Sequence, residues 1–166
     1  MSSAAAVHQD YQLTLRVYWE DTDAGGVVFY ANYLKFFERA RTEWLRSLGH
    51  QQERMRIDSG VMFVVTDTTV RYLRPARLDD LLDVTVLVRH AGRAQMTVAQ
   101  QAWRRVPAGN QNPGLNGDVD AGSLSPHAGR ELVAEGTIRI GCVDAGTFRP
   151  ARIPTPVFDA IAGLAP

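Results

Sequence analysis

The amino-acid sequence predicts an α+β fold in which a curved antiparallel sheet wraps around one long central helix. Two observations predict it. Residues 32–48 repeat apolar side chains at steps of three and four, the period of an amphipathic helix. Segments before and after this stretch alternate apolar and polar residues, the period of a strand. The order is one strand, the helix and then four strands, and an antiparallel sheet with an apolar face needs the helix to cover it.

The first strand and the helix have the clearest patterns. Residues 11–19 alternate so that Tyr11 and Trp19 are expected on the same face of one strand. The helix of residues 32–48 is expected to take Asn32 as its N-cap and to stop before Gly49. Its aromatic face is expected to be buried in the core.

Strands dominate the rest of the chain. Residues 50–60 are polar and are expected to hold a short helical turn. Four alternating segments follow, and their succession favours consecutive hairpins; they span 61–73, 82–89, 94–103 and 131–143. Residues 107–129 are rich in Pro, Gly, Asn and Ser, and are expected to form a flexible inserted loop. In the tail, 150–166, Thr155 as N-cap and Pro156 at the first helical position predict a short helix.

Composition bounds the function. The 166 residues are expected to form a single domain, 1–166. With 18 basic and 18 acidic residues the formal net charge is zero, which gives no support to nucleic acid or an anionic membrane as partner. Cys142 is the only cysteine, so no internal disulfide can form. No signal peptide and no apolar run of membrane-spanning length is seen, and a cytoplasmic location is expected. The His and Cys spacings do not fit a zinc site, and no metal is expected.

The richest candidate for chemistry is the turn between the first strand and the helix. Glu20, Asp21 and Asp23 stand beside the pair Gly25-Gly26, and the helix begins a few residues later. A carboxylate can act as a base or a nucleophile, and the free N–H groups at a helix entrance can stabilise a developing anion. Acidic loops are more often solvated turns, and on these grounds alone both interpretations stay open.

Residues 16–43, RVYWEDTDAGGVVFYANYLKFFERARTE, make a more specific case. This run closely resembles the YbgC-like, Tol-Pal-associated acyl-CoA thioesterases, in the 4-hydroxybenzoyl-CoA thioesterase branch of the hotdog superfamily. The shared pattern is an acidic pair D-x-D, small residues, V-V with aromatics, and then the helix. Weaker resemblance continues through Phe63-Val64-Val65, residues 72–80 and Cys142-Val143-Asp144, so that only 107–129 looks like an insertion. The resemblance implies the hotdog fold and hydrolysis of acyl-CoA thioesters.

The resemblance also implies roles for two residues. Asp23 corresponds to the catalytic carboxylate of the family, as general base or nucleophile. The backbone N–H of Tyr30 corresponds to the group that polarises the thioester carbonyl. Many relatives carry His at the position of Tyr30, so assistance from an imidazole is not expected here. Glu20 and Asp21 are expected to support the turn.

Substrate-binding candidates are of two kinds. Phe29, Tyr33, Val61, Phe63 and Val64 are candidates for lining an apolar acyl pocket, with simple packing in the core as an equal alternative. Arg89 and Arg93 flank a turn and are candidates for meeting the phosphates of coenzyme A, as are Arg71, Arg74 and Arg77. Coenzyme A is then part of the substrate, and no cofactor is expected.

The expected partners follow from the same resemblance. They are an acyl-CoA or acyl carrier protein as substrate carrier, a second copy in a homodimer or homotetramer with the substrate between subunits, and peripheral association with the inner-membrane Tol-Pal proteins. Two other functions stay open. One is a hotdog hydratase or dehydratase that uses Asp23 with Glu38, although no histidine is near either residue in the sequence. The other is non-catalytic binding of acyl-CoA or acyl carrier protein.

Overall fold

A computed structural model describes residues 11–107 and 129–166, so the expected loop of 107–129 lies almost wholly outside the described residues. The elements in chain order are β1 (Tyr11–Arg16), a short 3₁₀ helix (Trp19–Asp21), α1 (Asn32–Ser47), α2 (Gln52–Ser59), β2 (Val61–Tyr72), β3 (Leu81–Ala91), β4 (Gln95–Arg105), β5 (Arg130–Asp144) and α3 (Thr155–Ala162).

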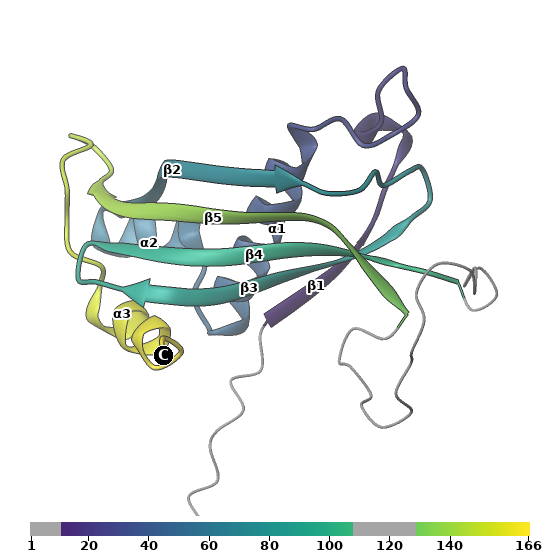
Figure 1. Cartoon of the computed structure of the whole chain (residues 1–166). Helices are drawn as coiled ribbons and strands as arrows, with labels where there is room; N and C mark the ends of the chain where they lie inside the picture. The colour runs from purple at the N-terminus through teal and green to yellow at the C-terminus, as the bar shows by residue number, and fades with distance from the viewer. Residues whose placement is uncertain (1–10, 108–128) are drawn as a thin grey trace, which may run out of the picture.

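The strands form one antiparallel five-stranded sheet in the described part of the chain, in the order β1-β3-β4-β5-β2. Figure 1 shows α1 lying across one face of this sheet. The predicted α+β fold of a curved sheet around one long helix is therefore confirmed. The expected consecutive hairpins are found only from β3 to β5, because β2 crosses over to pair with β5 and β1 pairs with β3. The two edges of the sheet are thus β1 and β2.

The aromatic face of α1 makes the core. Phe36, Phe37 and Ala40 are completely buried against the sheet. Gly136 in β5 allows this close packing, since a Cβ there would lie 3.2 Å from the Phe37 ring and 3.0 Å from the Thr69 carbonyl oxygen. Burial of apolar area of this kind is the main source of stability for the helix.

The chain between β1 and α1 differs from the prediction. The strand ends at Arg16, and residues 19–21 turn into the 3₁₀ helix. Trp19 consequently does not share the inner face with Tyr11 but is 79% exposed. The alternating pattern continued past the point where the backbone leaves the sheet, so periodicity alone placed Trp19 wrongly.

Two predicted helix caps are also wrong. Asn32 is the first residue of α1, preceded by Ala31 as N-cap, and its side-chain amide bonds to Asp21. Thr155 is the first residue of α3, after Pro154 as N-cap. The expected stop at Gly49 is confirmed by its positive φ of 88° after the C-cap Leu48. The short helical turn expected in 50–60 is the two-turn helix α2. None of the described helices combines the length and apolar character of a membrane span.

Candidate active site

The acidic turn closes on itself as a tight backbone loop. The N–H of Asp23 donates to the Val27 carbonyl at 2.9 Å, and the Gly26 N–H donates to the Asp23 carbonyl at 3.0 Å. Gly26 has a φ of 74°, a conformation that glycine adopts without strain. The pair Gly25-Gly26 therefore lets the chain reverse within four residues.

The Asp23 carboxylate is held at this turn but remains exposed. Its Oδ1 accepts a hydrogen bond of 2.8 Å from the Gly25 N–H. A Cβ at Gly25 would stand 3.1 Å from the same oxygen, so glycine keeps this approach unhindered. Within the described residues no hydrogen bond reaches Oδ2. One oxygen thus orients the carboxylate, and the other is open to water or a ligand.

Asp21 has a different environment, since its side chain is only 3% exposed. One carboxylate oxygen accepts the Tyr18 N–H at 2.8 Å, and the other accepts the Asn32 amide at 3.3 Å. Its backbone carbonyl accepts the Phe29 N–H at 2.9 Å. Asp21 is therefore occupied in tying the turn to the start of α1.

Tyr30 stands at the entrance of α1. The neighbouring N–H groups of Phe29 and Asn32 donate to backbone carbonyls, whereas no hydrogen bond among residues 11–107 and 129–166 has the Tyr30 N–H as donor. N–H groups at a helix start lack partners within the helix and lie at its positive end. The Tyr30 N–H is thus available to an oxygen of a bound ligand.

An aromatic cluster surrounds this entrance. The Tyr30 ring lies 4.7 Å from Phe29 and 6.1 Å from Tyr72, measured between centroids. Tyr33 lies 5.6 Å from Tyr72, and burial raises the pKa of the Tyr33 hydroxyl. Tyr30, Tyr33 and Tyr72 line an open hollow of about 290 Å³. Residues 27–28 before α1 and 73–75 after β2 complete it. The hollow gives an aromatic wall next to the free N–H.

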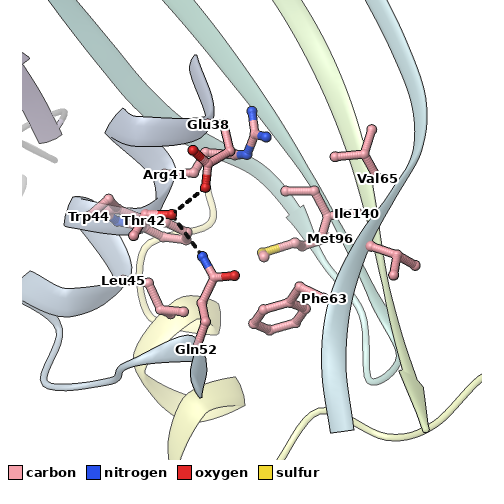
Figure 2. Close-up of a pocket in the computed structure, with 11 residues that line it drawn as sticks. Glu38, Arg41, Thr42, Trp44, Leu45, Gln52, Phe63, Val65, Met96 and Ile140 are labelled. Atoms are coloured by element: carbon pink, nitrogen blue, oxygen red, sulfur yellow. Dashed lines mark hydrogen bonds between the residues drawn. The ribbon is translucent and has the colours of Figure 1, made fainter. Parts of the chain in front are cut away.

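A second pocket, of about 190 Å³, lies further along α1 between the helix and the sheet (Figure 2). Its sheet side is apolar and is formed by Phe63, Val64, Val65, Met96 and Ile140. Its helix side carries polar groups as well, namely Glu38, Arg41 and Thr42, with Gln52 from α2. An apolar cavity with a few placed polar groups is typical of a small-molecule site.

The described residues hold no cluster of three His, Cys, Asp or Glu side chains that could bind a metal ion. The groups available for chemistry here are the exposed carboxylate of the turn and the unpaired backbone N–H at the helix entrance that follows it.

Comparison with known proteins identifies the family. Residues 25–108 match the model of the thioesterase superfamily. The acyl-CoA thioesterase YbgC of Haemophilus influenzae is 34% identical over 147 residues, 89% of this chain and 90% of that protein. The chain belongs to the thioesterase superfamily. Within it the chain is YbgC-like: it is also 51% identical over 74 residues to the acyl-CoA thioester hydrolase YbgC of Escherichia coli O6:H1, over 45% of this chain and 54% of that one.

The fold of this thioesterase is found in solved structures too. A Staphylococcus aureus protein solved in complex with CoA superposes with a TM-score of 0.76, covering 99% of this chain and 90% of that chain at 17% identity. At that identity the likeness shows the hotdog fold alone.

The predicted substrate-binding residues of the thioesterase do not form one site. Phe63 and Val64 line the pocket beside α1, whereas Tyr33 lines the aromatic hollow, with the Phe29 ring against Tyr30. Val61 and Arg93 line a third hollow of about 480 Å³ near the start of α3.

The arginines proposed for the phosphates lie in three places: Arg71 and Arg89 line one hollow of the sheet, Arg74 lines the aromatic hollow, and Arg93 lines the hollow near α3. Arg89 lies on the outer face of the sheet, apart from Arg93, and neither makes an ion pair with a described residue. Arg71 pairs with Glu135, and Arg74 pairs with Glu131.

Three residues that line these pockets were not among the predicted substrate-binding residues. Tyr72 completes the aromatic hollow although it lies some forty residues beyond Tyr30 in the chain. The helical pattern puts Glu38 mostly on the side away from the apolar stripe and assigns no role to Arg41, yet both line the pocket of Figure 2. The sequence did contain a signal for this. Glu38, Arg41 and Leu45 are three and four residues apart, and positions with that spacing share one face of a helix.

Proposed function

We propose that this YbgC-like thioesterase hydrolyses acyl-CoA thioesters to the free acid and coenzyme A, with Asp23 and the Tyr30 N–H as the reacting groups. Its relatives of the same family carry that activity in their names. The observation that carries the assignment is the turn itself, where Gly25 orients one oxygen of the Asp23 carboxylate and the other stays open. The unpaired Tyr30 N–H lies at the helix entrance that follows.

The chemistry needs few groups, because a thioester has a good leaving group. As a general base, Asp23 takes a proton from water while the water oxygen bonds to the carbonyl carbon. The C–S bond then breaks, and the CoA thiolate leaves and accepts a proton. As a nucleophile, an Asp23 oxygen bonds to the carbonyl carbon, the C–S bond breaks and the CoA thiolate leaves and takes a proton; water then hydrolyses the resulting anhydride and regenerates the carboxylate. Both routes yield the same products.

The Tyr30 N–H would donate to the carbonyl oxygen as negative charge develops on it. Removal of one such donor typically lowers the rate by about 10²–10³. Because the donor belongs to the main chain, side-chain substitution at Tyr30 is expected to leave it in place. Asp23 is therefore the sharper site for mutation.

We also propose that the thioesterase acts as a homodimer, or as a homotetramer built from such dimers. β2 is an edge strand of twelve residues whose outer side has no partner strand among the described residues. Val65 and Tyr72 on this strand are 51% and 47% exposed. A long edge strand with exposed apolar residues is a template for pairing with another strand. Acyl carrier protein as an alternative substrate carrier, and association with Tol-Pal proteins, remain proposals that rest on the sequence resemblance.

The decisive experiment compares the wild type with Asp23→Asn on a panel of acyl-CoAs, by release of free thiol. We expect the variant to lose at least about 10²-fold in kcat/KM, since the amide neither accepts the proton of water nor attacks the carbonyl. Glu20→Gln is the matched control, because Glu20 is an exposed carboxylate three residues away. Wild-type rates in Asp23→Asn would reject the mechanism, and an inactive wild type on every acyl-CoA would reject the function.

A further inference from the structure

Arg41 lies in an unusual environment for an arginine. It points from α1 toward the sheet, and the sheet side of the pocket that it lines is apolar, with side chains such as Phe63 and Val65 (Figure 2). No ion pair among the described residues involves its guanidinium. Burial lowers its pKa, while the nearby Glu38 charge raises it. A partly buried cation without a paired anion is costly, which suggests a use beyond packing.

The guanidinium is held in place by one neutral group. Its Nη1 donates to the side-chain oxygen of Gln100 at 2.8 Å. Gln100 is completely buried in β4, and its amide nitrogen donates to the carbonyls of Phe37 at 3.0 Å and Thr85 at 3.3 Å. These two bonds fix which end of the amide faces Arg41. The direction of the guanidinium is therefore set before any ligand binds.

Most of the donors of this guanidinium are unused. Arginine has five N–H donors in a planar fork, and the bond to Gln100 accounts for one. Every fully buried side-chain nitrogen or oxygen of the described residues has a hydrogen-bond partner, so the unbonded nitrogens of Arg41 are accessible from the pocket or from solvent. Glu38 forms no hydrogen bond or ion pair with Arg41 among the described residues, and its carboxylate accepts the Thr42 hydroxyl at 2.8 Å.

We propose that this pocket binds the distal end of an acyl group that carries a terminal carboxylate, and that Arg41 selects it. A carboxylate matches the planar fork of a guanidinium, with two parallel N–H···O bonds. The methylenes of the acyl group would contact Phe63, Met96 and Ile140. The pocket, of about 190 Å³, has room for the distal part of a short chain. This inference rests on the proposed acyl-CoA hydrolysis and specifies its substrate class as dicarboxylic acyl thioesters.

The position of Arg41 makes chain length part of the inference. Arg41 is nine residues beyond Asn32, about 14 Å along the helix axis. The chain length with the strongest preference therefore measures how far Arg41 lies from the reacting carbonyl, within one chain or across the proposed dimer.

The test compares dicarboxylic acyl-CoAs with methyl-ended ones of equal carbon number: adipoyl with hexanoyl, suberoyl with octanoyl, and sebacoyl with decanoyl. The measured quantity is the ratio of kcat/KM within each pair. We expect Arg41→Gln to lower this ratio about 10- to 100-fold at the preferred length, the effect of losing hydrogen bonds to a charged group. Arg39→Gln is the matched control, an exposed arginine on the same helix, and should leave the ratio unchanged. A residue that only held α1 to the sheet would change both members of a pair alike.

Two additions keep the result decisive. Arg41→Lys retains the charge without the fork, and it should keep part of the preference even if the Gln variant folds poorly. Calorimetric binding of each acyl-CoA to Asp23→Asn, with and without Arg41→Gln, reports recognition in the absence of turnover. An unchanged ratio in both Arg41 variants, or equal binding in the presence and absence of Arg41, would overturn the inference. If the wild type turned over none of the acyl-CoAs but binding still preferred the dicarboxylic ones through Arg41, the result would instead count against the proposed function.

Discussion

Asp21 and Asp23 show how two identical side chains, two residues apart, acquire different roles. The Asp21 carboxylate is buried, and both of its oxygens accept hydrogen bonds from groups that belong to the turn and to α1. The Asp23 carboxylate is exposed, and one oxygen is bonded only to Gly25. A carboxylate with both oxygens hydrogen-bonded stabilises the fold, whereas one with a free oxygen can take part in chemistry.

This contrast predicts that substitution at Asp21 lowers stability, whereas substitution at Asp23 does not. Asp21→Ala should lower the free energy of unfolding by about 1–2 kcal/mol, because it leaves the Tyr18 N–H and the Asn32 amide without their acceptor. Asp23→Asn should leave the free energy of unfolding close to that of the wild type. Urea unfolding followed by circular dichroism measures both. An Asp21→Ala protein as stable as the wild type would show that the buried bonds contribute nothing net.

The sequence alone could not separate these two residues. Physical reasoning found the carboxylates, the glycines and the helix entrance, since each is a local pattern. The burial of Asp21 depends on Tyr18 turning its N–H inward and on Asn32 reaching back, and both follow from the 3₁₀ helix that replaced the expected end of the strand. The assignment of Asp23 came from the family resemblance, and its role remains a proposal.

At the scale of elements, Asp83 joins four strands. This aspartate of β3 is completely buried, and it accepts hydrogen bonds from Arg105 in β4, at 2.7 and 2.9 Å, and from Thr14 in β1, at 2.6 Å. Arg130 at the start of β5 lies 3.2 Å from it. Burial acts to raise the pKa of Asp83, but the bonds from Arg105 and Thr14 and the charge of Arg130 hold it below its ordinary value. The cluster lies where β4 leads into the undescribed segment and β5 returns from it.

The lowered pKa predicts the acid dependence of stability. A carboxyl whose pKa is lower in the folded state stabilises the fold above its unfolded pKa of about 3.9, and that contribution is lost as the pH falls through the folded value. Asp83→Asn should therefore lower the free energy of unfolding by about 2–3 kcal/mol at neutral pH and flatten its decline in acid. Urea unfolding of the wild type and the variant, from neutral pH down into acid, measures this difference in the free energy of unfolding. Asp67→Asn is the control, an exposed aspartate of β2, and an acid limb unchanged by Asp83→Asn would contradict the assignment.

Periodicity predicted the elements better than their surroundings. The alternation along β3 puts Asp83 on the opposite side from Leu82 and Val84, where a polar residue is expected to face solvent, but Arg105 and Arg130 cover that side here. Likewise periodicity located the strands to within a few residues but could not assign the partners of β1 and β2, because those pairings join segments far apart in the chain. A pattern along one strand says which residues share a face, and only the fold says what lies against it.

At the scale of the whole molecule, the two parts of the proposed site lie apart on one chain. The turn of Asp23 is at the entrance of α1, whereas the pocket of Figure 2 lies further along the helix, beside Val65 on the edge strand β2. Pairing of β2 with β2 of a second copy would extend the sheet and bring this pocket to the contact between the copies. The exposed apolar residues of β2 and the proposed dimer are thus two aspects of one arrangement.

The dimer can be tested without reference to activity. Lysine on an edge strand blocks pairing with another edge, because its charge would have to be buried or brought near its own copy. Val65 and Thr68 are both exposed on β2, so Val65→Lys with Thr68→Lys should leave the single chain folded and convert the dimer to a monomer. Light scattering coupled to size exclusion measures the mass directly. Gln95→Lys adds one lysine at an exposed position of the central strand β4, away from the edge, and should remain dimeric. A wild type that is monomeric at every concentration, or a doubly substituted protein that stays dimeric, would rule out pairing through β2.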